Sequence, residues 1–517
     1  MDRPAKRQRV DDPQAHVLES LQRPISPPER RRREVSTIKS PWQLTWIQDL
    51  PEEDNRDAVS LRDLLGDPLI AECWEFNFLH DIHFLMDAFD SDTRHLVKVH
   101  VVHGFWKRED EGRIAIEQAA AEFENVQVHI APMPEMFGTH HSKMMILFRH
   151  DDTAQVIIHT ANMIPKDWTN MTNGIWKSPL LPKMTVAPTN TTSSSPEDHP
   201  VGSGDRFKTD LLNYLRAYDR RKITCKTLTD ELVNYDFSGI KAALVASVPG
   251  RHNVHDMSDT SWGWAGLKRC LQQVPCEDQE QSEIVVQISS IATLGAKEDW
   301  LKKTLFEPLS RCKNPSLEKP KFKVVFPTAD EIRRSLDGYA SGGSIHTKIQ
   351  SAQQAKQLEY LRPIFHHWAN DSPNGAKLPG SATVKDGGRK RAAPHIKTYI
   401  RSNKSSIDWA LMTSANLSKQ AWGEAARPTG EMRIASWEIG VLVWPELLET
   451  DSIMVGTFKT DVPDARPEEQ SEKKRSLIGL RIPYNTPLQR YGSDEIPWVA
   501  TMVHSEPDWM GRAWGQR

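Results

Sequence analysis

The stretch GTHHSKMMILF, residues 138–148, places a histidine and a lysine, His141 and Lys143, directly before a run of five apolar residues. In an extended strand, residues two apart point to the same face, so these two side chains project together. A His-x-Lys triplet alone is weak evidence, because chance supplies about one in a chain of this size. The chain contains three, HSK at 141, HTK at 346 and HIK at 395. The residues after each triplet therefore separate a repeat from coincidence.

Two of the triplets belong to a duplicated unit. Asn162, in HTAN, follows His141 at a distance of 21 residues, and Asn416, in TSAN, follows His395 at the same distance. Each unit has the pattern of a strand, a charged turn and a second strand. The HTK triplet at 346–348 has neither the strand nor the asparagine, so we interpret it as a coincidence. We expect the two units to meet about a pseudo-dyad and to surround one pocket.

Such a pocket would hold two imidazoles, two ammonium groups and two amides, a set that suits phosphoryl transfer from a diester. The ammonium and amide groups can meet the charge on the non-bridging oxygens. One histidine can form a phosphohistidine, while the other protonates the leaving oxygen and then activates water. No metal or other cofactor is required, and no Asp/Glu cluster of the two-metal kind lies nearby in the sequence. The cationic and amide members are Lys143, Lys397, Asn162 and Asn416.

The wider pattern predicts an α/β protein made of two similar α-β-α sandwich halves. Alternation at 96–104, a helical stretch at 110–124 and another strand at 126–131 give a βαβ rhythm. The second half repeats this rhythm with strands at 283–290 and 321–327. Further strands are predicted after His141, at 154–162, at 242–250 and after His395, and further helices at 206–219, 297–308 and 352–369.

The amino-terminal segment differs from the rest in charge. Residues 1–40 hold ten Lys or Arg against six Asp or Glu, set among Pro, Ser and Gln. We expect a disordered tail whose basic clusters, PAKRQRV at 4–10 and ERRRRE at 29–34, bind a nuclear import receptor; a merely solubilising tail is the alternative. The predicted domains are the tail 1–39, an N-terminal half 40–245 with an insertion at 186–204, and a C-terminal half 246–517 with an insertion at 370–393.

Bulk properties exclude several classes of protein. The 517 residues favour two large domains. A net charge of -3 argues against a surface that is basic all over, so polyanion binding must be local. Five cysteines without a CxxC pair indicate neither a disulfide framework nor a zinc site. No apolar run approaches the ~20 residues that span a bilayer, and no signal-peptide core begins the chain, so we expect neither membrane insertion nor export.

At the duplicated units the chain resembles the phospholipase D superfamily, and more closely its tyrosyl-DNA phosphodiesterase branch (type 1). The superfamily usually has Asp five residues after the lysine, where this chain has Phe148 and Ser402. That difference argues against a lipid phospholipase and agrees with the tyrosyl-DNA branch. The resemblance covers roughly 40–517. The stretches that carry it include FGTHHSKMM at 137–145, IHTANMIPKDW at 158–168, GIWKSPL at 174–180, PHIKTYIR at 394–401, TSANLSKQAWG at 413–423 and EIGVL at 438–442.

The resemblance implies hydrolysis of a 3′-phosphotyrosyl bond, where a trapped topoisomerase I remains attached to DNA, with a 3′-phosphate as product. It implies that His141 is the nucleophile and His395 the general acid and then base. Glu438 stands where the family has an acidic residue that orients a histidine; the alternative is a solvated charge at a strand end. Asn173 stands where we expect Gln, and its shorter side chain reaches less far.

DNA contacts follow from the same resemblance. Phe137 matches a position that stacks on the single strand, an interaction of ~1–3 kcal/mol per base, although a lone aromatic could equally belong to the core. The residues that would bind backbone phosphates are Ser289, Ser290, Thr293 and Ser418. Without the resemblance, these serines and this threonine would be ordinary turn residues.

Three functions remain open at this point. The first is a nuclear DNA repair enzyme that acts on the 3′ end of DNA carrying a tyrosyl peptide. The second is a general 3′-exonuclease or phosphodiesterase of the same fold, and the third is a catalytically dead DNA-binding scaffold. Both His-x-Lys pairs and both asparagines are present, which weighs against the third. Because the duplication completes the pocket within one chain, a monomer is expected.

Overall fold

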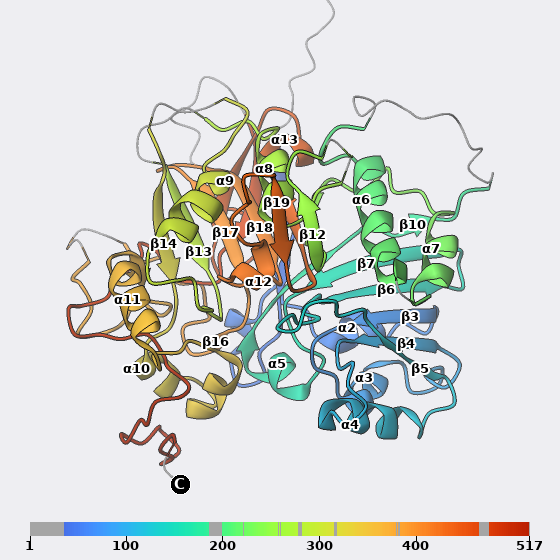
Figure 1. Ribbon diagram of the computed structural model, residues 1–517, viewed down its shortest axis with the longest axis horizontal. Helices are drawn as coiled ribbons and strands as arrows, with labels where there is room; N and C mark the ends of the chain where they lie inside the picture. Colours follow the sequence, from blue (N-terminus) through green and yellow to red (C-terminus); the bar gives the residue numbers. More distant parts are fainter. Residues whose placement is uncertain are drawn as a thin grey trace, which may run out of the picture.

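Two mixed β-sheets with surrounding helices make up the part of the chain that the structure describes (Figure 1). The first sheet lies at the lower right of Figure 1 and the second at the centre and upper left. The predicted α/β fold with two similar halves is confirmed. The computed structural model describes residues 36–185, 199–220, 222–256, 258, 260–277, 282–314, 318–378, 380, 383–464 and 475–515.

The first half contains an eight-stranded sheet of order β2-β9-β7-β6-β3-β4-β5, with β10 paired to β7. Its strands are β2 (Gln43–Leu44), β3 (Ile70–Phe76), β4 (Lys98–His103), β5 (Val126–Ile130), β6 (Met144–Arg149), β7 (Thr153–His159), β9 (Gly174–Lys177) and β10 (Leu181–Pro182). Its helices are the short η1 (Glu52–Asp54), α2 (Leu61–Leu65), α3 (Ile82–Ala88), α4 (Glu111–Ala120), α5 (Pro165–Thr169), α6 (Gly204–Ala217), η3 (Tyr218–Arg220) and α7 (Lys226–Leu232).

The second half contains a ten-stranded sheet. Its strands are β1 (Thr37–Ile38), β11 (Ala243–Ser247), β13 (Glu283–Gln287), β14 (Lys321–Val325), β15 (Phe365–His366), β17 (Thr398–Ser402), β18 (Ile407–Thr413), β20 (Glu438–Val443), β21 (Ser452–Thr457) and β22 (Ser476–Arg481). Its helices are α8 (Gly263–Leu271), the π-helix η4 (Trp300–Phe306), α9 (Glu307–Leu309), α10 (Ala329–Arg333), η5 (Gly338–Ser344), α11 (Ala352–Leu361), η6 (Arg362–Ile364), α12 (Lys419–Trp422) and α13 (Pro445–Leu448).

The two sheets repeat one strand order. In the first, β5-β4-β3-β6-β7 are neighbours, and in the second β15-β14-β13-β17-β18 are neighbours in the same sense. The first three strands of each series are parallel, and the last two are antiparallel to their neighbours. His141 lies just before β6 and His395 just before β17, so the duplicated motifs occupy equivalent positions at the ends of equivalent strands.

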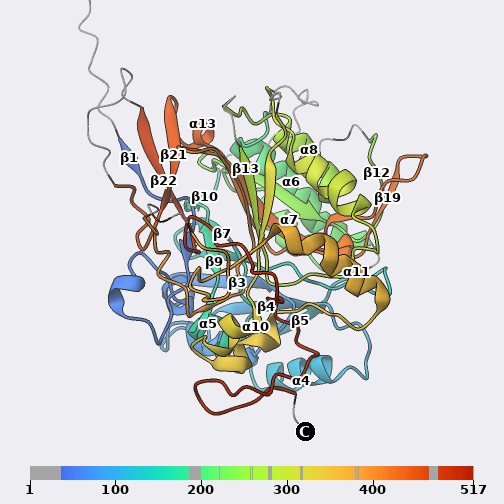
Figure 2. The same ribbon diagram turned by 90° about the vertical axis from the view of Figure 1, so that its left-hand side faces the viewer.

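Two small pairings lie outside the two sheets. The strands β8 (Met171–Thr172) and β16 (Ala393–Pro394) pair in parallel and join the halves. The ribbon of β12 (Gly250–Asn253) and β19 (Glu431–Ile434) is antiparallel. In Figure 2 this ribbon projects at the right, beyond α8, while β1, β21 and β22 form the opposite edge of the second sheet.

The apolar strands are buried on both faces. In β6, Met144 and Ile146 point into a core shared with the second sheet, whereas Met145 and Leu147 point into a core under the helices of the first half. The shared core also takes up Met412 of β18 and one side of α6. Burial on both faces explains why these strands lack a polar alternation, and the shared core holds the two halves in fixed relation.

Several predicted boundaries differ from the structure. The predicted helix 352–369 ends at Leu361, because Pro363 lacks an N–H and cannot continue it, and the chain then enters β15. Thr37–Ile38 lies within the predicted tail but pairs with β22. The predicted boundary between the two halves, near 245, falls inside β11 of the second sheet. The basic clusters of the tail, and residues 186–198 of the first predicted insertion, lie outside the described residues.

The second predicted insertion is packed against the first half. The guanidinium group of Arg389 is fully buried and donates hydrogen bonds to the backbone carbonyls of Asp54 and Thr45.

No helix in the described parts of the chain is both long and apolar enough to cross a membrane.

Removing the buried His367 should destabilise the second half in a pH-dependent way. Its Nδ1 lies 3.2 Å from Glu331 and its Nε2 lies 2.8 Å from Glu495. Burial alone would lower the pKa of His367, but the two carboxylates raise it above the usual value. We expect His367→Gln to cost about 3–5 kcal/mol of unfolding free energy at pH 6, because the buried Glu331 and the half-buried Glu495 then lose their cation.

The difference between the two proteins should shrink as pH rises, because a histidine with a raised pKa loses its stabilising charge when pH passes through that value. Urea unfolding of both proteins at pH 6 and pH 8 measures it. A difference that stays constant or grows with pH would contradict an ionised His367.

Candidate catalytic pocket

His141 is oriented by the second half of the chain. Its backbone N–H donates to the carbonyl of Trp437 at 3.0 Å, and its Nδ1 lies 2.9 Å from Oε2 of Glu438. The same carboxylate oxygen accepts a hydrogen bond from Ser414. Glu438 is buried and paired, so the alternative of a solvated charge at a strand end is wrong.

His395 is oriented by the first half. Its Nδ1 lies 3.0 Å from Oδ2 of Asp167 and 3.2 Å from Oδ1 of Asn173, and its backbone N–H donates to the carbonyl of Thr172 at 2.9 Å. Asp167 is fully buried and also accepts from the backbone N–H of Asn162 at 2.6 Å. Each histidine therefore takes its carboxylate partner from the opposite half. Sequence reasoning missed Asp167, although it lies within IHTANMIPKDW, because nothing in the sequence pairs it with a histidine 228 residues later.

The short side chain of Asn173 does reach His395. Its Oδ1 accepts from Oγ1 of Thr160 at 2.9 Å, and its Nδ2 donates to the carbonyl of Asp167 at 2.8 Å. These bonds fix which end of the amide faces the imidazole. Asn173 is therefore an acceptor toward Nδ1–H of His395.

The two lysines are completely buried close to the histidines. Nζ of Lys143 donates to the carbonyl of His141 at 3.4 Å, and Nζ of Lys397 donates to the carbonyl of His395. Burial lowers the pKa of Lys143 to about 8, and burial together with the charge of Lys143 lowers the pKa of Lys397 well below its usual value. Because burial and like charge disfavour the charged forms of these lysines, a nearby anion would stabilise both ammonium groups.

Burial keeps the imidazoles neutral, and the carboxylates set their tautomer. Burial alone would raise the pKa of Asp167, but His395, the N–H of Asn162 and Lys397 lower it to about 2, so Asp167 is an anion. Burial lowers the pKa values of both histidines, with Glu438 opposing this at His141 and Asp167 at His395. A neutral imidazole whose Nδ1–H donates to a carboxylate presents the lone pair of Nε2 to the pocket. This is the form of a nucleophile.

The two asparagines play unequal local roles. Oδ1 of Asn416 accepts from the backbone N–H groups of Ser289 at 3.1 Å and Ser290 at 2.9 Å, which leaves its amide N–H₂ for a ligand. Oδ1 of Asn162 is buried without a hydrogen-bond partner among the described residues. Both asparagines line the same pocket.

This pocket has a volume of about 320 Å³ and brings together most of the predicted residues. Phe137 lines its rim with 75% of its surface exposed, so the core alternative for this side chain is wrong. Thr293 lies outside the lining and accepts a hydrogen bond from Gln354 instead. The predicted residues in the lining are Phe137, His141, Asn162, Ser289, Ser290, His395, Asn416, Ser418 and Glu438.

His346 also lines the pocket, although the sequence led us to dismiss its triplet as a coincidence. Its triplet lacks the strand and the asparagine of the repeat, but its backbone N–H donates to the carbonyl of Ser289 at 2.9 Å. That bond holds the segment after η5 against the turn at Ser289 and Ser290. Excluding His346 from the site was therefore wrong.

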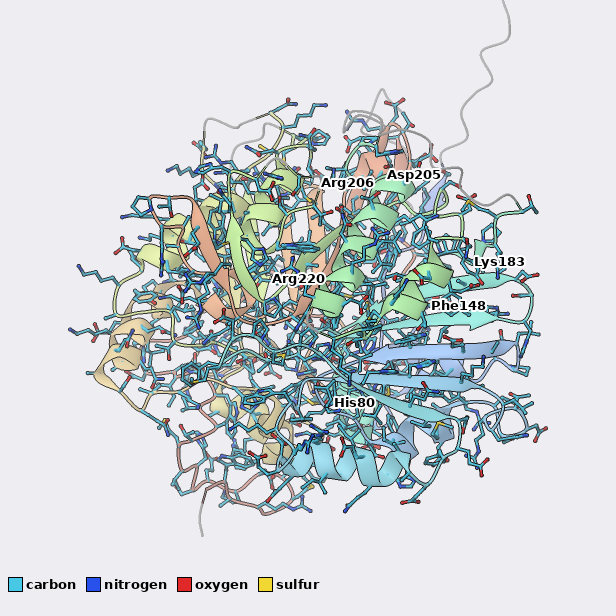
Figure 3. All side chains as sticks on the ribbon, turned by 45° about the vertical axis from the view of Figure 1, so that its right-hand side comes forward. His80, Phe148, Lys183, Asp205, Arg206 and Arg220 are labelled. Atoms are coloured by element: carbon cyan, nitrogen blue, oxygen red, sulfur yellow. The ribbon has the colours of Figure 1, made fainter. Side chains whose placement is uncertain are left out.

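Phe148, at the position where the resemblance to the phospholipase D superfamily would predict aspartate, lies in the core. It packs against the ring of Tyr235 at 5.5 Å between centroids, at the far end of β6 from His141 (Figure 3). A carboxylate at this position would be buried among apolar groups.

Within the described residues, no group of three or more His, Cys, Asp or Glu side chains is placed to hold a metal ion.

Known proteins resemble this chain over most of its length. The family model described as tyrosyl-DNA phosphodiesterase matches residues 41–492. A probable tyrosyl-DNA phosphodiesterase of Schizosaccharomyces pombe is 30% identical over 95% of this chain and 99% of its own length. Tyrosyl-DNA phosphodiesterase 1 of Arabidopsis thaliana is 29% identical over 92% of this chain and 77% of its own length. The crystal structure of the yeast tyrosyl-DNA phosphodiesterase has the same fold, with a TM-score of 0.61 at 20% identity over 90% of this chain and 99% of that one.

Proposed function

Because the chain belongs to the tyrosyl-DNA phosphodiesterase family, whose members are phosphodiester hydrolases, we propose that it cleaves the bond between a DNA 3′-phosphate and tyrosine. The substrate would be the 3′ end that a trapped topoisomerase I leaves, and the product a 3′-phosphate. The observation that carries this proposal is the crosswise arrangement of the two imidazoles, each held by a carboxylate of the opposite half at one pocket.

In the first step, Nε2 of His141 attacks phosphorus. Its lone pair forms the N–P bond while the P–O bond to tyrosine breaks and the electron pair stays on the phenol oxygen. The anionic phosphate raises the pKa of His395 on binding, and Nε2–H of His395 then donates its proton to that oxygen. Glu438 stabilises the positive charge that His141 acquires.

In the second step, His395 acts as a base. Its Nε2 takes a proton from water as the water oxygen attacks phosphorus, and the N–P bond breaks with its electron pair returning to His141. Lys143, Lys397 and the amide of Asn416 would meet the non-bridging oxygens in both steps. The two ammonium groups are buried beside the carbonyls of the histidines, and Asn416 lines the pocket. The products are a 3′-phosphate and the regenerated enzyme.

A panel of 3′-adducts on one oligonucleotide tests this function. We expect a 3′-phosphotyrosyl substrate to be cleaved with release of tyrosine and a 3′-phosphate, in the presence of EDTA. Stepwise release of nucleotides with equal efficiency would favour the general 3′-exonuclease instead. Binding of DNA without turnover of any adduct would favour the catalytically dead scaffold. Activity lost to EDTA and restored by Mg²⁺ would contradict the two-histidine mechanism.

We also propose that the protein works in the nucleus as a monomer. The basic clusters at 4–10 and 29–34 support import, and the completion of the pocket within one chain supports the monomer. A fluorescent fusion should concentrate in nuclei and lose that pattern when the Lys and Arg residues of both clusters become Ala. A fusion that still concentrates in nuclei after these substitutions would contradict the role of the tail. Light scattering of the purified protein tests whether it is a monomer.

Asp167→Asn should show that Asp167 is a positioning residue for His395. We expect kcat to fall by about 10²- to 10⁴-fold, because a neutral amide holds the imidazole less well in the required tautomer. Asp167 raises the pKa of His395, so the limb of the pH-rate profile that requires protonated His395 should move to lower pH. Asp151→Asn, at an exposed aspartate of the same half, is the matched control. A fall in kcat with an unmoved limb would indicate a structural role only.

A further inference from the structure

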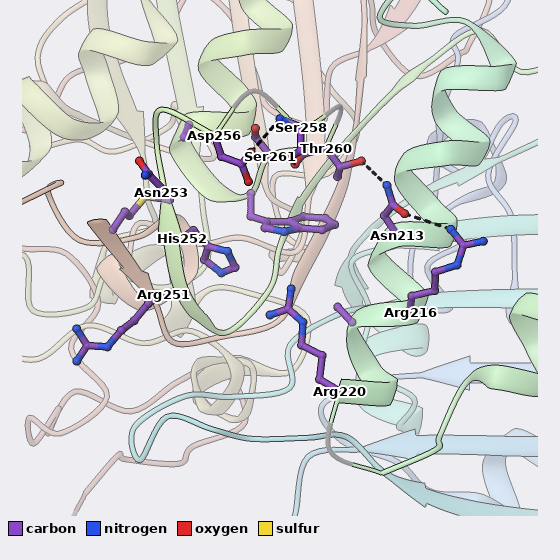
Figure 4. Close-up of a pocket in the computed structure, with 14 residues that line it drawn as sticks. Asn213, Arg216, Arg220, Arg251, His252, Asn253, Asp256, Ser258, Thr260 and Ser261 are labelled. Atoms are coloured by element: carbon purple, nitrogen blue, oxygen red, sulfur yellow. Dashed lines mark hydrogen bonds between the residues drawn. The ribbon is translucent and has the colours of Figure 1, made fainter. Parts of the chain in front are cut away.

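A second pocket, of about 790 Å³, lies between the carboxyl end of α6 and the ribbon β12–β19 (Figure 4). Arg216 and Arg220 come from the end of α6 and η3, and Arg251 and His252 come from β12. Among the lining residues that the structure describes, Asp256 is the one carboxylate. None of these residues belongs to the catalytic pocket, so the two-histidine reaction gives them no role.

Within the described part of the chain, two of the three arginines have no carboxylate partner. Among the described residues, no Asp or Glu lies within ion-pair distance of Arg216 or Arg220; Arg216 donates to Oδ1 of Asn213 at 3.2 Å. Arg251 differs, because it pairs with Glu431 at 2.6 Å. Arg216 and Arg220 are both exposed, so their guanidinium groups are open to a ligand.

Arg220 points across the pocket rather than back to its own helix (Figure 4). The Nη1 atom of Arg220 lies 4.0 Å from the position that a Cβ atom on Gly250 would take. Burial lowers the pKa of His252, and the positive charge of Arg220 lowers it further. Nε2 of His252 is bonded to the carbonyl of Val248 at 2.7 Å. Figure 3 locates Arg220 at the lower end of α6 and the paired Arg206 near its other end. Of the arginines on α6 and η3, the two without a described carboxylate partner therefore lie at the same end of the helix.

The elements that build this pocket also build the catalytic one. From α6 and η3, the hydroxyl of Tyr218 contacts Nε2 of His140 at 2.9 Å, next to the nucleophile. Met432 of β19 lines the second pocket, and Ser436, four residues later, lines the catalytic pocket. Four residues of extended chain span at most about 14 Å. A polymer that enters one pocket can therefore reach the other.

We propose that this pocket binds the phosphodiester backbone of the DNA strand whose 3′ end occupies the catalytic pocket. The proposal rests on the proposed function and adds a second contact to the same substrate. Unpaired guanidinium groups bind phosphate in a bidentate manner, and the volume suits a nucleotide-sized group. The chain has a net charge of -3, so such a local site is where a polyanion would be held. DNA is favoured over the peptide end of the same substrate, which is tethered equally near, because every nucleotide carries a phosphate charge whatever its sequence.

The test compares the Arg216→Ala/Arg220→Ala variant with the wild type on labelled oligonucleotides that end in a 3′-phosphate and so are not cleaved. Fluorescence anisotropy gives the Kd for a strand of about four nucleotides and one of about twenty. We expect the variant to bind the long strand about tenfold more weakly, because two charged contacts are lost, and to bind the short strand as the wild type does. The ratio of the short-strand Kd to the long-strand Kd should therefore fall by about tenfold. The slope of log affinity against log salt should fall by about 1.4 for the long strand.

Three controls make the result specific. Lys303→Ala removes an exposed lysine elsewhere in the second half and should leave both affinities unchanged. Arg216→Lys/Arg220→Lys should restore most of the salt slope, because the charges return. Equal Tm values exclude a loss of helix stability at the carboxyl end of α6 as the cause.

Equal affinity ratios and equal salt slopes in the variant and the wild type would overturn the proposal. So would binding of a polyglutamate peptide that depends on Arg216 and Arg220 while DNA binding does not. Because the oligonucleotides are not cleaved, a positive result stands even if the 3′-phosphotyrosyl substrate proves inert. The failure of either proposal is therefore recognised separately.

Discussion

Replacing His141 by alanine is expected to lower the rate of phosphotyrosyl hydrolysis by at least about 10⁴-fold. In the proposed mechanism this imidazole supplies the electron pair of the N–P bond, whereas His395 handles protons and the two lysines meet the phosphate oxygens. The neighbouring His140 is buried, with its Nδ1 bonded to the carbonyl of Asn77 at 2.8 Å and its Nε2 to Tyr218, so it cannot substitute. Single-turnover kinetics with enzyme in excess measure the loss directly.

His150→Ala is the matched control, because His150 is exposed at the opposite end of the same strand, β6. That variant should keep the wild-type rate. A folded His141→Ala protein that retains turnover within about tenfold of the wild type would contradict covalent catalysis by this residue. Detection of the phosphoryl group on a different side chain would contradict it as well.

His395→Asn is expected to stop the reaction halfway. Asparagine cannot take a proton from water, so the second step should slow by about 10²- to 10⁴-fold. The first step should lose less, because the leaving phenol has a pKa near ~10 and departs with less need of a proton. A covalent enzyme-DNA species should therefore accumulate, visible on a denaturing gel with 5′-labelled DNA. Mass spectrometry should locate the phosphoryl group on a peptide that contains His141.

The double variant His141→Ala/His395→Asn is the control, since it should form no covalent species. If His395→Asn hydrolyses the substrate at the wild-type rate, His395 is not the base. If the double variant still forms the covalent species, the nucleophile is another residue. Equal slowing of both steps in His395→Asn would indicate that the substitution disturbs the whole pocket.

Local sequence was enough to predict the fold class and the two His-x-Lys-Asn sets. Strand alternation and helical periodicity are local properties, so they can be read from neighbouring residues. The spacing of 21 residues between His and Asn occurs twice, which indicates the same strand-turn-strand unit in both halves. The equivalent positions of His141 and His395, each before the central antiparallel strand of its sheet, follow from that repetition.

The three-dimensional arrangement decided which histidine each carboxylate holds, although the resemblance had already marked Glu438 as a residue that orients a histidine. Glu438 lies 297 residues from His141, and Asn173 lies 222 residues from His395, so no local pattern connects these partners. Asp167 was missed for the same reason, and His346 was dismissed because its triplet has no repeat around it. Their positions depend on the shared core that packs one sheet against the other. Such packing depends on the shapes of many side chains that are far apart in the sequence, so it cannot be predicted from the spacing of motifs along the chain.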